Sequence, residues 1–313
     1  MEGYFKIYMA KLSVVIPVFN ESELLEELVK RVKLNMGKIT EDYEIVLVDD
    51  GSQDATWDKI VMESHSEKRI KGIKFSRNFG HHYAITAGLH QASGEWVVVM
   101  DGDLQDRPEV IPQLFNKAQE GFDVVFVSRQ NRPEKLYYRV AQKLFYWSLR
   151  KLSGIDFDSS QANFSIINRK VVDGFKNFPE NARFYGSTIK WLGFKRSYVL
   201  ANHGIRYAGK PSYTLRKRFK LAADIILSFS ERPLKFAIAL GGFMSLFSLF
   251  ITFLLVYRVI FESHMLSPLT TLIAAIFFST GVVLIVIGIS GIYIGEIFRQ
   301  VKNRPLYVIE KRF

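Results

Sequence analysis

The chain has 313 residues, which is long enough for one large domain or two smaller ones. It contains no cysteine, and this excludes disulfide bonds and thiol catalysis. Its formal net charge is +11, but no nucleic-acid-binding signature accompanies the charge, so an anionic lipid surface or lipid phosphate is a better partner than a nucleic acid.

Apolar runs and helical periodicity alternate along the first 130 residues. A buried strand is predicted at 12–19, and further strands at 43–48, 70–75, 96–100 and 124–127. An amphipathic helix is predicted at 21–33, and further helices at 56–66, 82–91 and 108–120. This alternation predicts an α/β, Rossmann-like fold with a mostly parallel sheet and helices on both of its faces.

Polar clusters follow the predicted strands, at the points where the strands end. They are Asn20-Glu21, Asp49-Asp50, Arg77-Asn78, Asp101–Asp103 and Ser128-Arg129. Ligands of mostly parallel sheets bind beyond the carboxyl ends of the strands. The clusters therefore predict a binding site at one edge of the sheet.

The run Asp101-Gly102-Asp103 is the most informative of these clusters. In an extended chain the side chains at positions i and i+2 lie on the same side, so both carboxylates can face one cation. Mg²⁺ or Mn²⁺ held by one or two carboxylates usually takes its remaining ligands from water and substrate phosphates. The motif therefore indicates an enzyme that handles a nucleoside diphosphate, although two aspartates alone also suit a simple turn.

Two long stretches near the C-terminus carry no charged side chain. Residues 236–257 and 266–295 each exceed the ~20 residues that a helix needs to cross a bilayer. Buried helices of a soluble core are the alternative, but two such runs in succession favour two membrane spans. Basic residues flank the pair on both sides, so the positive-inside rule predicts that both flanks are cytoplasmic.

These spans divide the chain into four predicted parts. We expect a cytoplasmic α/β domain at 1–210, an amphipathic basic helix at 211–233, two transmembrane helices at 234–297 and a cytoplasmic basic tail at 298–313. The segment 136–152 is a further amphipathic helix, suited either to a membrane surface or to ordinary packing. The first nine residues lack a continuous apolar core, so we expect no signal peptide.

Three motifs carry a resemblance to a known family. Residues 16–21 (Ile-Pro-Val-Phe-Asn-Glu), 49–54 (Asp-Asp-Gly-Ser-Gln-Asp) and 101–106 (Asp-Gly-Asp-Leu-Gln-Asp) resemble the inverting family 2 glycosyltransferases with a GT-A fold. These three motifs are followed along the chain by Ser128-Arg129, the segment 206–209 and the paired spans. The order of all these features is similar to that in the polyprenyl-phosphate glycosyltransferases. This group includes dolichol-phosphate mannose synthase and bactoprenol glucosyltransferase.

The resemblance implies a reaction and a location. It implies inverting transfer of a sugar from a nucleotide sugar, with a UDP-hexose favoured, to undecaprenyl phosphate, with Mg²⁺ or Mn²⁺ as cofactor. It also implies a multi-pass protein of the bacterial inner membrane, with its catalytic domain and both termini in the cytoplasm. UDP-N-acetylhexosamine and GDP-mannose stay open as donors, and so does a homo-oligomer.

The resemblance also assigns roles to individual residues. The nucleotide-sugar pocket is implied to comprise Pro17, Phe19, Asn20, Glu21, Asp49, Asp50, Arg77, Asp101, Gly102 and Asp103. The implied metal ligands are Asp101 and Asp103, with Gln105 as a further candidate. Arg129 and Arg139 match residues that bind the lipid phosphate, and Arg206 matches an arginine that contacts the donor diphosphate. Arg77 equally suits an ordinary surface position.

The chain departs from the family pattern at two places. Many relatives have Asp-Thr-Gly-Asp-Phe where this chain has Ser160-Gln161-Ala162-Asn163-Phe164, so an amide replaces a carboxylate sometimes proposed as a base. An acceptor phosphate is already a competent nucleophile near neutral pH and needs no such base. The second departure, residues 209–212 (Gly-Lys-Pro-Ser), leaves the accepted sugar open.

Two other functions compete with this interpretation. A processive polysaccharide synthase is disfavoured because none of the four tryptophans follows Gln-x-x-Arg and two spans are too few for a pore. A non-catalytic membrane scaffold with a glycosyltransferase shell is disfavoured by the intact Asp50, Asp101, Asp103 and Arg129.

Overall fold

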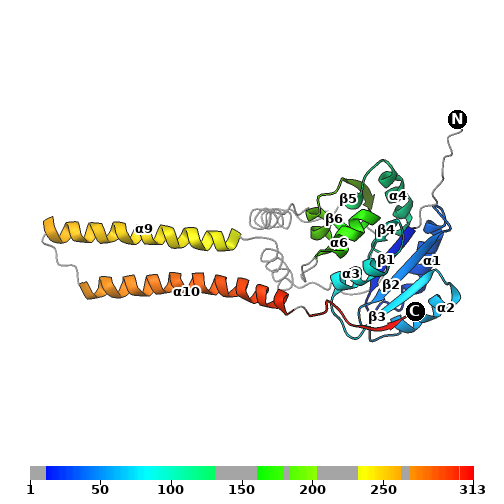
Figure 1. Cartoon of the computed structure of the whole chain (residues 1–313), viewed down its shortest axis with the longest axis horizontal. Coiled ribbons are helices and arrows are strands. Elements are labelled where there is room, and N and C mark those ends of the chain that lie inside the picture. Colours follow the sequence, from blue (N-terminus) through cyan, green and yellow to red (C-terminus); the bar gives the residue numbers. More distant parts are fainter. Residues whose placement is uncertain (1–11, 131–160, 179–183, 203–231, 262–267, 303) are drawn as a thin grey trace. The chain divides into compact units, whose positions relative to one another are not determined.

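The computed structural model describes residues 12–130, 161–178, 184–202, 232–261, 268–302 and 304–313 (Figure 1). These residues form two compact units. The first, called here the sheet domain, contains the described residues up to 202 together with 304–313. The second, the helical unit, contains those from 232 to 302.

The described strands of the sheet domain form one mixed sheet. They lie in the order β7-β5-β6-β4-β1-β2-β3-β8. Their bounds are β1 Leu12–Val18, β2 Tyr43–Asp49, β3 Ile70–Phe75, β4 Trp96–Val99, β5 Val124–Gln130, β6 Gln161–Asn168, β7 Arg196–Asn202 and β8 Ile309–Arg312. The pairs β4–β1, β1–β2, β2–β3 and β5–β7 are parallel, whereas β6 and β8 pair with their neighbours antiparallel.

Helices cover both faces of this sheet, as the alternating pattern predicts (Figure 1). Apolar side chains of α1 (Leu25–Met36), α2 (Thr56–Ser66) and α4 (Ile111–Gln119) pack on one face. Those of α3 (His81–Gln91), α6 (Arg169–Lys176) and α7 (Tyr185–Trp191) pack on the other. The central strand β1 is buried along its whole length, which is why its sequence is an almost continuous apolar run.

The elements predicted before residue 130 are confirmed, with small shifts of their ends. The first helix begins at Leu25, four residues after the predicted start at 21. A 3₁₀ turn, η1 (Pro108–Val110), precedes α4 because prolines stand at 108 and 112. The elements β6, β7, α6 and α7 were not predicted from the sequence, and each is only seven or eight residues long.

The last residues form an edge strand of the sheet, where the sequence suggests only a basic tail. In β8 and beyond, Phe313 N donates to Gly72 O at 2.9 Å, and Gly72 N donates to Phe313 O at 3.1 Å. The Tyr307 ring stacks on Phe75 of β3 at 4.9 Å. This strand covers the outer edge of β3, which would otherwise present unpaired backbone groups.

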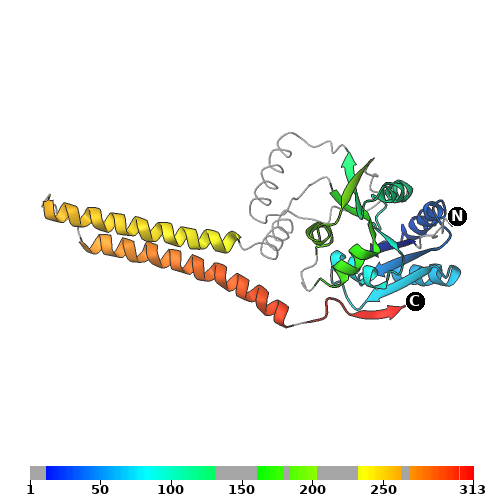
Figure 2. The same cartoon turned by 45° about the horizontal axis from the view of Figure 1, so that its top comes forward.

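The helical unit consists of two long helices that lie side by side (Figures 1 and 2). They are α9 (Arg232–Phe261) and α10 (Pro268–Val301). One segment of the described residues, Thr271–Gly295, is long and apolar enough to cross a membrane, and none of it is buried within the structure. Helices are confirmed at both expected spans, but the two-span transmembrane hairpin stays a prediction. The predicted amphipathic segment 136–152 lies outside the described residues, and so does the predicted segment 211–233 except for its last two residues, which begin α9.

Candidate active site

The candidate site lies at the carboxyl ends of four adjacent parallel strands. β4, β1, β2 and β3 are neighbours in that order, and each ends in a polar loop. The loops comprise residues 100–107, 19–24, 50–55 and 76–80. The fifth polar cluster belongs to β5, which runs in the same direction as β4 but is separated from it by β6. The structure therefore brings four of the predicted clusters to one edge of the sheet, where ligands bind in such folds. Ser128-Arg129 instead lies inside β5, which continues to Gln130 and does not end at the predicted residue 127.

The loops after β1 and β2 are joined by hydrogen bonds. Asn20 N donates to Ser52 Oγ at 2.9 Å, and Gln53 N donates to Asn20 Oδ1 at 2.9 Å. Glu21 N donates to Thr56 Oγ1, also at 2.9 Å. Asn20 has a φ of 54°, a left-handed conformation that asparagine tolerates better than most residues. The side chain of Asn20 thus shapes this part of the site by holding the two loops together.

Pro17 and Phe19 have different surroundings although both were assigned to the nucleotide pocket. Pro17 is buried inside β1, whereas Phe19, just past the end of the strand, is 43% exposed. The exposed aromatic ring offers a flat apolar surface at the edge of the site. The structure brings Pro17, Phe19, Asn20 and Glu21 together there, and their role in binding a nucleotide stays a prediction.

Two buried aspartates end β2. Asp49 accepts a hydrogen bond from Ser52 N at 2.8 Å through Oδ1, and its Oδ2 has no hydrogen-bond partner among the described residues. Asp50 accepts hydrogen bonds from Phe79 N at 2.7 Å and from Gly80 N at 2.9 Å. Burial raises the pKa of both carboxyl groups and outweighs the hydrogen bonds that lower them. Asp50 therefore anchors the loop that precedes α3.

The next residue, Gly51, allows that loop to pack closely. Gly51 has a φ of 75°, and a Cβ there would lie 2.7 Å from Asn78 N. Any side chain at this position would push the loop 76–80 away. Arg77 on this loop is exposed, and its guanidinium lies 4.1 Å from the centre of the Phe79 ring. The predicted contact of Arg77 with a donor stays a prediction.

The loop after β4 carries the two aspartates of the central motif. Asp101 N donates to Oδ2 of the buried Asp106 at 3.2 Å, which fixes the backbone of the loop. Gly102 between the aspartates packs against the end of β1, where a Cβ would lie 2.8 Å from Val18 Cγ1. The glycine thus lets Asp101 and Asp103 approach the loop after β1.

The donor set of this loop fits a divalent cation bound together with a diphosphate. Asp101 and Asp103 are both partly exposed, and Gln105 N donates to Asp103 Oδ1 at 3.1 Å. No group of three or more histidine, aspartate or glutamate side chains among the described residues could hold a metal alone. Two carboxylates are nevertheless the usual protein share of a Mg²⁺ site that substrate phosphates and waters complete.

A histidine that the sequence analysis missed lies in this site. His81, the first residue of α3, places Nε2 3.2 Å from Asp101 Oδ1. The same nitrogen lies 3.2 Å from Nδ2 of Asn163 in β6. Burial lowers the pKa of His81, but the negative charges of Asp101, Asp50 and Asp106 outweigh it and raise the pKa. The only sequence signal is a histidine pair that directly follows the loop after β3.

The neighbouring histidine, His82, is held by ring packing and by a hydrogen bond. The ring of His82 packs edge-on against His81 at 5.5 Å and against Phe184 at 5.4 Å. Its Nδ1 accepts a hydrogen bond from Tyr185 N at 3.4 Å. Burial, helped by the charge of His81, lowers the pKa of His82 to about 3. His82 is therefore neutral near pH 7 and supports the position of His81.

Of the three arginines assigned to phosphate groups, the described residues include only the backbone of Arg129. The backbone of Arg129 pairs with Ala201 of β7 at the end of β5, and its side chain lies outside the described residues. Arg139 and Arg206 also lie outside the described residues. Their roles stay predictions.

Residues 13–173 match the model of the family described as glycosyl transferase family 2. The chain belongs to this family. It is 37% identical over 302 residues to the glycosyltransferase YkcC of Bacillus subtilis strain 168, a match that covers 96% of this chain and 94% of YkcC. Family 2 membership makes the protein a glycosyltransferase, an enzyme that moves a sugar from an activated donor to an acceptor.

Two further comparisons concern a relative of named activity and the fold. The chain is 31% identical over 304 residues to the undecaprenyl-phosphate 4-deoxy-4-formamido-L-arabinose transferase of Yersinia enterocolitica. This match covers 96% of this chain and 93% of that protein. The fold resembles that of glucosyl-3-phosphoglycerate synthase from Mycobacterium tuberculosis in complex with Mn²⁺, UDP and phosphoglyceric acid, with a TM-score of 0.51 and 20% identity. This match covers 70% of this chain and 76% of that one, and it confirms the expected GT-A-like fold.

Proposed function

We propose that this family 2 glycosyltransferase moves a sugar from a nucleotide sugar to undecaprenyl phosphate. The choice of acceptor is inferred from one observation. The Yersinia enterocolitica relative named for undecaprenyl phosphate is 31% identical over 96% of this chain. A UDP-hexose is the favoured donor, and transfer inverts the configuration of the sugar. The proposed product is a polyprenyl-phosphate sugar.

In this proposal, Asp101 and Asp103 hold Mg²⁺ or Mn²⁺ together with the donor diphosphate, and Gln105 is a further candidate ligand. The bound ion supplies Lewis-acid stabilisation of the leaving diphosphate. Both aspartates lie on one loop, with Gly102 packed between them against the end of β1. This packing holds the loop that carries both proposed carboxylate ligands of the metal ion.

The residues of the chain then have separate tasks. Phe19, Asn20 and Glu21 line the nucleotide pocket, and Asp50 supports it by holding Phe79 N and Gly80 N. Arg129 and Arg139 bind the acceptor phosphate, for which a planar and permanently charged guanidinium is well suited. Arg206 contacts the donor diphosphate.

The acceptor needs no general base from the protein. A phosphate monoester carries roughly −1.5 to −2 charges near pH 7 and attacks as it stands. Asn163 lies in the site, 3.2 Å from His81 Nε2, and its neutral amide cannot remove a proton. A phosphate acceptor is consistent with an amide at this position, whereas a sugar hydroxyl would be helped by a base.

The helical unit supplies the membrane contact of the proposal. The segment Thr271–Gly295 can cross a bilayer by length and composition, and the charge-free part of α9 is the second proposed span. With both basic flanks in the cytoplasm, the sheet domain lies at the cytoplasmic face of a bacterial inner membrane. Such an arrangement gives the site access to a lipid-linked phosphate.

The test is sugar transfer by membranes that contain the full chain. Membranes supplied with undecaprenyl phosphate and a radiolabelled nucleotide sugar (UDP-glucose, UDP-N-acetylglucosamine or GDP-mannose) are expected to form labelled lipid with one donor. Asp103→Asn is expected to lower the rate at least ~100-fold, because it weakens an interaction worth several kcal/mol at the leaving group. Asp58→Asn, at an exposed position on α2, is the matched control and keeps the rate.

Two results would contradict the proposal. Wild-type membranes that label no lipid with any of these donors would exclude transfer from UDP-glucose, UDP-N-acetylglucosamine or GDP-mannose to undecaprenyl phosphate. An Asp103→Asn variant as active as the wild type would exclude the role given to this carboxylate.

A further inference from the structure

The imidazole of His81 lies between two side chains from different parts of the sheet. Its Nε2 is 3.2 Å from Asp101 Oδ1 and 3.2 Å from Asn163 Nδ2. His81 begins α3, Asp101 follows β4, and Asn163 is in β6. The three residues are far apart in the sequence, so this arrangement exists only in the folded chain.

The contact with His81 determines how Asp101 is presented. Oδ1 of Asp101 is buried beside the imidazole, while the Asp101 side chain as a whole is 30% exposed. The exposure therefore lies on the other atoms of the side chain. Because a carboxylate is planar, holding Oδ1 against His81 also sets the direction in which Oδ2 points.

Several independent contacts hold His81 itself in place. Asp50 accepts hydrogen bonds from the backbone N–H groups of Phe79 and Gly80, the two residues before His81. The His82 ring packs edge-on against the His81 ring at 5.5 Å. Ile85, four residues further along α3, is buried in the apolar core that the helix forms with the sheet. These contacts together fix the start of α3, where His81 lies.

We propose that His81 is a positioning residue, which holds Asp101 Oδ1 and so orients the carboxylate for the divalent cation that the donor site would bind. The inference rests on the metal site in the proposed function. His81 touches neither the donor nor the acceptor in this role. It acts through Asp101: the Nε2–H is directed at Asp101 Oδ1 and therefore does not accept from Asn163, and neighbouring side chains orient other metal-binding groups in the same way.

Two substitutions that differ by one methylene group test this role. The amide nitrogen of His81→Gln reaches about as far as Nε2 and can still donate to Asp101, whereas that of His81→Asn is too short. Both residues are polar and His81 is 36% exposed, so both variants are expected to fold. His65→Asn, at an exposed position on α2, is the matched control.

The direct measurement is Mn²⁺ binding to the purified full chain in detergent with UDP, followed by the electron paramagnetic resonance signal of free Mn²⁺. His81→Asn is expected to raise the dissociation constant of Mn²⁺ roughly 10–100-fold, and the Mn²⁺ concentration that gives half-maximal transfer by the same factor. His81→Gln is expected to restore most of the affinity, and His65→Asn to leave it unchanged. The KM for undecaprenyl phosphate should not move.

The outcomes separate this inference from the proposed function. If Asp101→Asn loses Mn²⁺ while His81→Asn binds it like the wild type, the positioning role is wrong and the metal site stands. If His81→Gln is as weak as His81→Asn, hydrogen bonding to Asp101 is not what His81 contributes. A wild-type chain that binds no Mn²⁺ with UDP would overturn both.

Discussion

The two ends of strand β2 each carry a buried carboxyl group in opposite electrostatic settings. Glu44, near the start of the strand, is 3% exposed, and Asp49, its last residue, is fully buried. Glu44 accepts hydrogen bonds from Ser13 Oγ at 2.6 Å and from Lys71 Nζ at 2.5 Å. It also accepts one from Ser93 N at 2.6 Å. The hydrogen bonds that lower the pKa of Asp49 come from Ser52, whose N donates at 2.8 Å.

The pKa values follow from this difference. Burial by itself raises the pKa of Glu44, but the hydrogen bonds from Lys71, Ser13 and Ser93 prevail and lower it to about 2. Burial likewise raises the pKa of Asp49, and there the hydrogen bonds from Ser52 are too weak to reverse it. The fold thus stabilises a negative charge at the amino end of the sheet and tolerates one at the carboxyl end. Uncompensated acidic groups of this kind concentrate where a protein binds its ligands.

The largest effect on stability is expected from Glu44→Gln. The pKa of Glu44 is about 2 in the folded chain and 4.5 as its ordinary value, which corresponds to about 3 kcal/mol of folding stability. This stability is present above pH 4.5 and is lost as the pH falls toward 2, because protonation removes the charge. Thermal unfolding followed by tryptophan fluorescence at pH 7 should show a midpoint roughly 6–12 °C lower, with the difference shrinking below pH 4.5.

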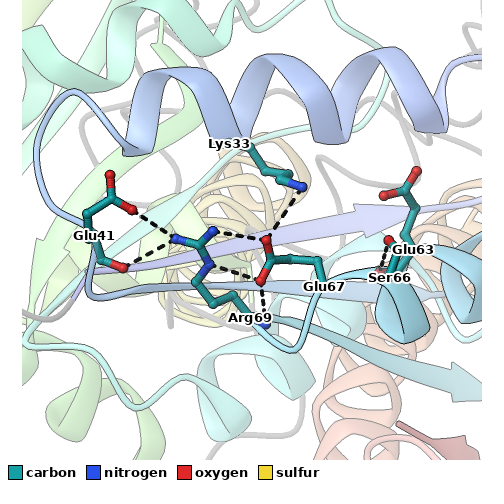
Figure 3. Close-up of polar contacts among 6 residues, drawn as sticks. All are labelled: Lys33, Glu41, Glu63, Ser66, Glu67 and Arg69. Carbon is teal, nitrogen blue, oxygen red and sulfur yellow. Dashed lines mark hydrogen bonds and ion pairs between the residues drawn. The ribbon is translucent and has the colours of Figure 1, made fainter.

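A second acidic group at the same end of the sheet is the control. Glu67 is paired with Arg69 at 2.9 Å and with Lys33 at 3.6 Å, and Arg69 also reaches Glu41 (Figure 3). The hydrogen bond from Arg69 lowers the pKa of Glu67 to about 2 as well, but the cluster faces solvent. Glu67→Gln should therefore cost less than about 1 kcal/mol. Equal losses for the two variants would contradict the distinction between buried and solvent-facing groups.

An intermediate effect is expected from Gly51→Ala at the carboxyl end. A left-handed conformation costs a residue with a Cβ about 1–2 kcal/mol, and Asn78 N would lie 2.7 Å from the new atom. The loop 76–80 must then move, and both stability and sugar transfer should fall. The control is Gly121→Ala, where φ is 91° but the nearest group is the flexible Lys195 Nζ at 3.8 Å. It should lose similar stability and keep its transfer rate, and a parallel loss of activity would refute the argument.

The smallest effect is expected from Asp49→Asn, and its sign is opposite to that of Glu44→Gln. Because burial raises the folded-state pKa of Asp49, the wild type loses stability as the pH rises through that pKa. A neutral amide avoids this loss, and its oxygen can still accept the hydrogen bond from Ser52 N. Thermal unfolding at pH 7 should show stability unchanged or raised by up to about 1 kcal/mol. A drop as large as that of Glu44→Gln would show that the charge of Asp49 is compensated after all.

Much of this protein can be predicted from its sequence because the relevant signals are local. Mostly apolar runs marked β1, β2 and β4, a short run with apolar ends marked β3, and the polar residues directly after these strands marked the edge at which ligands bind. Asp101-Gly102-Asp103 was visible as a motif because its residues are neighbours in the chain. The apolar stretches that form α9 and α10 were also evident from composition alone.

Other features depend on contacts between distant segments, and only the tertiary structure decides them. The meeting of His81, Asp101 and Asn163 requires α3, β4 and β6 to be assembled. The edge strand β8 is a short, charged sequence that becomes a strand because β3 offers unpaired backbone groups. The sequence alone determined which residues carry charge and where strands end, since these are properties of short segments. The folded sheet decided which charges are neutralised, since that depends on the neighbours each group finds.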